Sequence, residues 1–115
     1  MSQYHEPARE QDKKTRDLTR ALVSLQEEIE AVDWYNQRIG LTDNDELNAI
    51  LEHNRDEEIE HAAMLLEWLR RNMDAWDEEL ATYLFTEGDI TELEDEAEGG
   101  NEGNGKSGLN IGDLK

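Results

Sequence analysis

The chain has 115 residues, enough for one small domain, and it contains no cysteine, which excludes disulfides and thiolate metal sites. Its formal net charge of −19 opposes direct binding to nucleic acid, because a phosphate backbone would be repelled. No apolar run is long enough to cross a bilayer and no signal-peptide pattern opens the sequence, so we expect a cytoplasmic protein that binds neither membrane nor nucleic acid.

Two long helices are predicted after a flexible N-terminal segment at residues 1–10. Apolar residues from Leu18 to Ile39 recur at helical spacing, and Gly40 suits the end of that helix. The polar run 42–45 offers caps for a second amphipathic helix, which continues to Leu69. Because the connection is short, the two helices are expected to form an antiparallel hairpin.

A shorter third helix is predicted from Asp74, as its cap, to a point near Gly88. The helical domain is therefore expected at residues 11–90. An acidic, Gly/Asn-rich stretch at 91–106 is typical of a flexible linker, because it cannot bury enough apolar surface to offset its ordering entropy. Three aliphatic residues return in the final segment, 107–115, and such a tail usually binds a partner.

Three polar side chains interrupt the apolar faces of the two long helices. Glu28 stands in line with Leu25 and Val32, while Glu58 and His61 form a Glu-x-x-His pair on the apolar side of the second helix. An unpaired charge in such a seam is costly, so carboxylates there are generally paired or bound to metal. The alternative is a surface glutamate beside an ordinary core histidine.

One chain holds half of the ligand set of a carboxylate-bridged di-iron site, which takes a Glu from each of two helices and a Glu-x-x-His from each of two others. An isologous homodimer supplies the other half and completes a four-helix bundle around the two-fold axis. Oxygen ligands with an imidazole suit iron or manganese. We therefore predict an all-α fold and a di-iron centre, with calcium, zinc or cobalt only as adventitious occupants.

Four further residues of the first helix lie near this seam. Glu27, Glu30 and Trp34 share a neighbouring face and are candidates for guiding cations inward, although a solvated acidic face has the same pattern. Tyr35, two turns beyond Glu28, can support a ligand carboxylate or serve as a plain core residue.

The sequence also resembles the encapsulated ferritins from about His5 to Glu87. The stretches that carry the resemblance are 27–35, 53–64, 67–71 and 83–87, and the terminal Leu109–Leu114 is similar to the peptide that loads cargo into encapsulin shells. The resemblance implies a ferroxidase that oxidises Fe(II) to Fe(III) with O₂ and feeds iron to the lumen of an encapsulin nanocompartment for storage and detoxification.

The same resemblance implies a site and an assembly. Glu28, Glu58 and His61 would be the iron ligands, with Tyr35 near the centre and with Glu27, Glu30 and Trp34 on the path by which iron arrives. Five dimers would form a ring, a homodecamer, that docks inside the shell through residues 107–115.

Three other functions fit the residue pattern. A di-metal oxidase or peroxidase would consume oxidants without storing iron, and a passive metal buffer would bind Fe(II) without accelerating its oxidation. A non-catalytic acidic helical adaptor would act through its tail and hold no iron.

Overall fold

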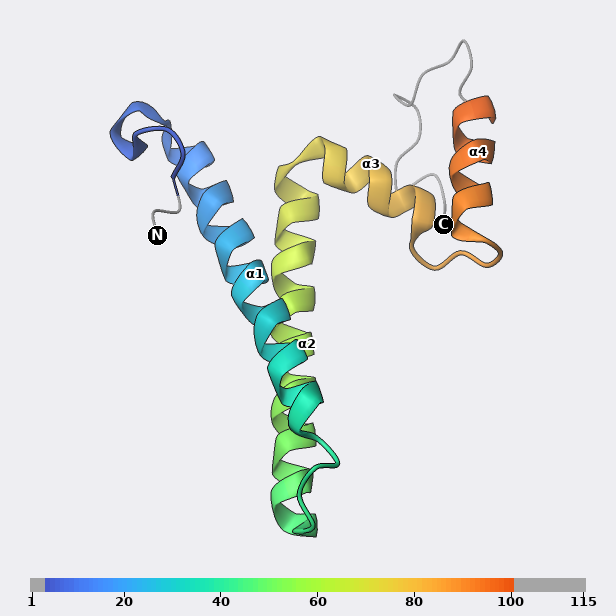
Figure 1. Cartoon of the computed structure of the whole chain (residues 1–115). Coiled ribbons are helices and arrows are strands. Elements are labelled where there is room, and N and C mark those ends of the chain that lie inside the picture. Colours follow the sequence, from blue (N-terminus) through green and yellow to red (C-terminus); the bar gives the residue numbers. More distant parts are fainter. Residues whose placement is uncertain (1–3, 101–115) are drawn as a thin grey trace. The chain divides into compact units, whose positions relative to one another are not determined.

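The computed structural model describes residues 4–100, which are helical and irregular, with no strand in that range. The elements are the 3-10 turn η1 (Ala8–Glu10) and the helices α1 (Lys13–Arg38), α2 (Asp45–Asn72), α3 (Asp74–Tyr83) and α4 (Ile90–Gly100) (Figure 1). The predicted all-α class is confirmed, while completion of a bundle by a second copy stays a prediction. The tail predicted to bind a partner, 107–115, lies outside the described residues. None of the helices described is long and apolar enough to span a membrane.

The chain divides into two compact units, residues 1–69 and 70–115. The first unit begins with η1, whose Ala8 carbonyl accepts a hydrogen bond of 2.8 Å from Arg16 Nε. Asp12 caps α1, because its Oδ1 accepts from the Thr15 amide at 2.7 Å. Residues 8–10 thus differ from the flexible segment predicted for 1–10: a short turn forms there and is tied to the start of α1.

The turn between α1 and α2 follows the predicted pattern. Gly40 has a φ of 88°, the left-handed conformation that commonly follows a helix and that glycine adopts without strain. Its amide donates to Asn48 Oδ1 at 2.8 Å, which fastens the end of α1 to the first turns of α2. Asn44 caps α2, since its Oδ1 accepts from the Leu47 amide at 2.9 Å.

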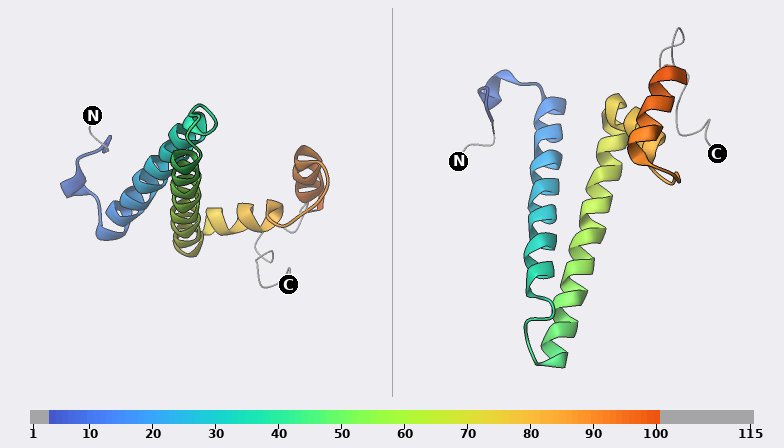
Figure 2. Two further views of the ribbon diagram at one scale, coloured as in Figure 1. Left: turned by 90° about the horizontal axis from the view of Figure 1, so that it is seen from below. Right: turned by 45° about the vertical axis from the view of Figure 1, so that its right-hand side comes forward.

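Helices α1 and α2 lie side by side and antiparallel, as the predicted hairpin requires (Figures 1 and 2). Arg55 Nη1 of α2 donates to Asn36 Oδ1 of α1 at 3.1 Å, so the two helices are linked above the turn as well. The hairpin has almost no core of its own: among the residues described in this unit, only Ala21 and Leu69 are buried. Much of its apolar surface is therefore exposed.

The second unit starts with the end of α2 and with α3. Arg70 Nη1 pairs with Asp77 Oδ1 at 2.7 Å, which ties these two helices together. The predicted cap is corrected here: Met73 precedes the helix, and Asp74 is already its first residue. The predicted end near Gly88 is also too late, because α3 ends at Tyr83 and Phe85 takes a left-handed φ of 59°.

Helix α4 was not predicted, because residues 91–106 have the composition of a linker. Asp89 starts this helix by accepting hydrogen bonds from the Thr91 amide at 3.0 Å and from the Thr91 hydroxyl at 2.6 Å. Contact with α3 then gives the short helix a packing surface. A strong cap and one packing neighbour offset the weak apolar content that suggested a linker.

Candidate metal centre

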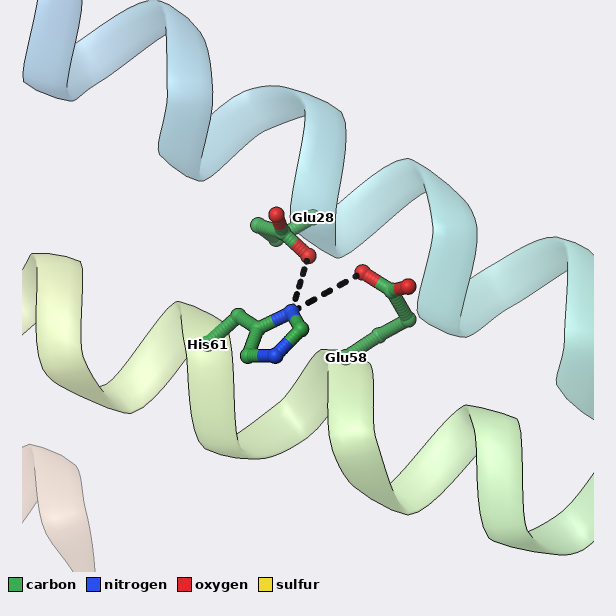
Figure 3. Close-up of side chains that lie close together, drawn as sticks. All are labelled: Glu28, Glu58 and His61. Carbon is green, nitrogen blue, oxygen red and sulfur yellow. Dashed lines mark ion pairs between the residues drawn. The ribbon is translucent and has the colours of Figure 1, made fainter.

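Glu28 of α1 and the Glu58–His61 pair of α2 come together across the hairpin (Figure 3). His61 Nδ1 lies 3.5 Å from Glu28 Oε2 and 3.7 Å from Glu58 Oε2. Each of the three residues offers one ligand atom, and these atoms all lie within 4.8 Å of one another. The structure thus brings Glu28 to a Glu58–His61 pair that lies 30 residues farther along the chain, and we predicted that these three side chains share a metal.

The hairpin geometry explains why the three meet. Glu58 and His61 stand at i and i+3, so both project from one face of α2 on successive turns. Glu28 reaches them because the Arg55–Asn36 hydrogen bond and the turn at Gly40 fix the register of α1 against α2. These contacts place the two carboxylates on opposite sides of one seam.

The cluster is partly withdrawn from water. The Glu28 and Glu58 side chains are 24% and 25% exposed, and Glu28 Oε2 is a buried atom without a hydrogen-bond partner among the residues described. The pKa of Glu28 is raised above its ordinary value of 4.5 first by a hydrogen bond with Glu58 that forms only when one of the two carboxyls is protonated, and then by burial and by the negative charge of Glu58, while His61 opposes these effects. When both carboxylates are ionised, the seam therefore carries negative charge that the surrounding described residues do not neutralise.

A divalent cation would neutralise the two carboxylates better than a single proton does. Two carboxylate oxygens and one imidazole nitrogen are ligands that iron, manganese and zinc accept, and the charge of the cation would offset both carboxylates. Three ligands leave positions open in the coordination sphere of iron. The three residues could therefore hold a cation together with further ligands.

The other predicted site residues lie outside this cluster. Glu27 and Glu30 are exposed and Trp34 is 51% exposed, and none of the three belongs to a ligand group in the part of the chain described. Tyr35 is half-buried, and Arg38 Cζ lies 5.4 Å from its ring centroid, within the range of a cation–π contact. The roles assigned to these four residues stay predictions.

A second group was missed by the sequence reasoning. Glu57, Glu60 and His61 also offer ligand atoms within 4.8 Å of one another, so His61 belongs to both groups. His61 Nε2 lies 3.9 Å from Glu57 Oε2, and His53 Nε2 lies 3.5 Å from Glu57 Oε1. The available signal was the spacing of four residues between 53, 57 and 61, which places the three side chains on one face of a helix.

This chain is similar to several known proteins. The EncFtn-like family model matches residues 3–87. A ferritin-like protein of Thermotoga maritima is 64% identical over 103 residues, 90% of each chain. An encapsulated ferritin-like protein of Rhodospirillum rubrum is 52% identical and covers 96% of this chain and 86% of its own. The crystal structure of protein NE0167 from Nitrosomonas europaea matches with a TM-score of 0.73 at 60% identity, over 76% of this chain and 96% of that one.

The raised pKa of Glu28 predicts a pH dependence of stability in the metal-free protein. Between the unfolded pKa and the higher folded pKa, the folded state holds more protons, so the contribution of this group is fully present below about pH 4.5 and is lost as the pH rises through the folded pKa. Glu28→Gln should remove this loss. Urea denaturation at a series of pH values should then show a gentler decline for the variant than for the wild type.

The matched control is Glu27→Gln, which removes the same charge from the adjacent exposed position. It should follow the wild-type curve, apart from a uniform shift. Parallel curves for Glu28→Gln and the wild type would contradict the assignment.

Proposed function

The chain belongs to the EncFtn-like family, and on this premise we propose that it is a ferroxidase that oxidises Fe(II) at a di-iron centre shared by two copies. The resemblance to encapsulated ferritins is confirmed by the family match and by the relative from R. rubrum. Iron is the substrate here, and the protein supplies the site at which its electrons are lost.

The observation that carries the proposal is the cluster of Glu28, Glu58 and His61. Its two carboxylates are crowded, and one buried oxygen has no hydrogen-bond partner among the described residues. A carboxylate left in this state is costly, and a bound cation relieves both the burial of charge and the repulsion. A surface acidic patch would not need such relief, because water would solvate it.

A second copy of the chain completes both the site and the core. Two copies of the cluster would bring four carboxylates and two imidazoles, the set found in ferritin-like di-iron proteins. The apolar surface of the hairpin also needs cover, since Leu47, Ile50 and Met64 are each about half exposed, at 46%, 50% and 59%. Isologous pairing of the hairpins would bury apolar surface and join the two half-sites.

The reaction balances with dioxygen as oxidant. Two Fe(II) ions lose one electron each, and O₂ takes the two electrons and two protons and leaves as hydrogen peroxide. Glu28 and Glu58 hold the ions and offset their charge, while His61 gives a neutral ligand. The two iron ions undergo the change of oxidation state. The part of this chain would be to orient the two ions and to limit the access of water.

Four residues of α1 are assigned outer roles. Glu27, Glu30 and Trp34 would line the path of Fe(II) toward the seam, where the exposed carboxylates of Glu27 and Glu30 attract cations from solution. Tyr35 would support the centre from its position two turns along α1. Arg38 Cζ lies over the ring of Tyr35.

The proposed destination of the product is an encapsulin shell. The relative from R. rubrum is named an encapsulated ferritin-like protein, and Leu109–Leu114 of this chain resembles a cargo-loading peptide. We propose that residues 107–115 dock the chain, as a ring of five dimers, inside the shell lumen, where Fe(III) is stored.

The first prediction concerns iron oxidation. Glu58→Gln or His61→Ala should lower the rate of Fe(III) formation by more than about tenfold, since losing even an outer partner of a metal ligand costs about 10–100-fold. Fe(II) is added anaerobically, air is admitted, and Fe(III) absorbance is followed. Glu52→Gln, an exposed glutamate of the same helix, is the control and should keep the wild-type rate. Binding without faster oxidation in the wild type would favour a passive buffer instead.

The second prediction concerns assembly. If the cation joins two half-sites, Fe(II) should raise the mass of the wild-type particle, and a chelator should lower it. Light scattering under anaerobic conditions measures both changes. The Glu58→Gln variant should respond much less, because its half-site is incomplete. An assembly indifferent to metal and chelator would separate dimer formation from the metal site.

The third prediction concerns the tail. Deleting residues 107–115 should leave iron oxidation unchanged and abolish capture by a co-expressed encapsulin shell, measured by co-purification. Retention of the shortened chain in the shell would show that another segment docks it.

A further inference from the structure

The imidazole of His61 stands between two sets of carboxylates. Its Nδ1 faces the seam, 3.5 Å from Glu28 Oε2 and 3.7 Å from Glu58 Oε2 (Figure 3). Its Nε2 faces the other way, 3.9 Å from Glu57 Oε2. The two nitrogens of one ring are therefore offered to different partners.

Only one of these nitrogens can hold a cation while the other carries hydrogen. A neutral imidazole has one N–H donor and one lone pair, and the partner of the N–H fixes which nitrogen keeps the lone pair. Histidines that bind metal almost always donate their other N–H to a carboxylate, a carbonyl or water. Glu57 is the carboxylate that lies on the Nε2 side of His61.

The two groups that share His61 compete for this ring. If Nε2 bound a cation with Glu57 and Glu60, the hydrogen would move to Nδ1, and Nδ1 could no longer serve Glu28 and Glu58. The inner pair is only 24% and 25% exposed and includes a buried, unpartnered oxygen, whereas Glu60 is exposed and solvated. A cation relieves more unfavourable charge at the inner pair, so the lone pair belongs on Nδ1.

Glu57 is itself held in place for this role. Its Oε1 lies 3.5 Å from His53 Nε2, one helical turn earlier, which leaves Oε2 toward His61. The separation of 3.9 Å is about 1 Å longer than a hydrogen bond, so the inference requires the Glu57 side chain, which is 46% exposed, to move by about that distance.

We propose that Glu57 is a positioning residue: it accepts the Nε2–H of His61 and so directs the Nδ1 lone pair into the seam between Glu28 and Glu58. This inference rests on the proposed metal site. It assigns Glu57 to the support of a ligand and not to a cation site of its own.

The first readout needs no activity and is made on the Zn(II)-loaded protein. Without a cation, the carboxylates of Glu28 and Glu58 would keep the hydrogen on Nδ1, because they lie nearer to Nδ1 than Glu57 lies to Nε2. Long-range ¹H–¹⁵N spectra of the full chain labelled at histidine nitrogen report which nitrogen of each ring carries hydrogen, and His61 should be Nε2–H in the wild type. In Glu57→Ala the Nε2–H should exchange with solvent about tenfold faster, the effect of losing a hydrogen bond to a charged group. Glu57→Gln keeps an acceptor oxygen and should restore much of the protection.

The second readout is the affinity for Co(II), followed through its visible spectrum. Glu57→Ala should weaken binding by about 10–100-fold, with Glu57→Gln in between. The control is Glu60→Ala, which removes the same charge from the third member of the outer group and should leave both the exchange rate of the Nε2–H and the affinity within about twofold of the wild type.

The outcomes separate this inference from the proposed function. Wild-type protein that binds no Co(II) would refute the metal site itself. Wild-type binding with an unchanged Nε2–H exchange rate and affinity in Glu57→Ala would refute only the role of Glu57. Equal losses in Glu57→Ala and Glu60→Ala would show an outer cation site and overturn the inference, as would a Glu57→Gln variant no better than Glu57→Ala.

Discussion

The closeness of Glu28 and Glu58 is the constraint on which the hairpin depends. Two carboxylates whose ligand atoms lie within 4.8 Å of each other's and of His61, with one oxygen buried and unpartnered, cannot both stay ionised at low cost. A proton relieves the repulsion at low pH, and a cation relieves it at neutral pH. Whether a proton or a cation lies between the two carboxylates therefore determines how stable the seam is.

Holding such a pair requires rigidity elsewhere. The left-handed Gly40 and the cap at Asn44 determine how α2 leaves the turn, and Arg55 reaches across to Asn36 farther along the hairpin. A helix rises about 1.5 Å and turns by about 100° per residue, so a slip of one residue would move Glu28 away from its partners by more than hydrogen-bond distances tolerate. Few apolar contacts resist that slip, because the hairpin is nearly coreless, and a second copy would supply them.

The helices and the inner cluster could be predicted because both follow from periodicity. Apolar spacing gave α1 and α2, Gly40 marked the end of α1, and the position of Glu28 inside an apolar stripe singled it out among the 30 acidic residues of the chain. The end of α3 was missed because the left-handed backbone conformation of Phe85 is rare for this residue type and cannot be predicted from composition. Helix α4 was missed because its cap and its contact with α3 outweigh a linker-like composition.

Glu57 could not be found by spacing alone. It stands one residue before Glu58 in a run of acidic side chains, which is the pattern of a solvated face, and only the rotamer of His61 shows which nitrogen it faces. Spacing places side chains on a helix face, but the direction of a ring within that face depends on packing across the seam. Ligands are therefore easier to predict than the groups that orient them.

The strong acidity of the chain does not by itself make the site. At physiological ionic strength charges farther apart than about 8 Å are largely screened, so most of the net charge of −19 raises the local concentration of cations without holding any one of them. Tight binding needs ligand atoms that lie within a few ångströms of one another and are shielded from water. Glu28, Glu58 and His61 meet that condition across two helices, whereas the exposed Glu27 and Glu30 do not. Under the proposed function, the acidic surface and the inner cluster would therefore act at different ranges: the surface would gather cations, and the cluster would bind them.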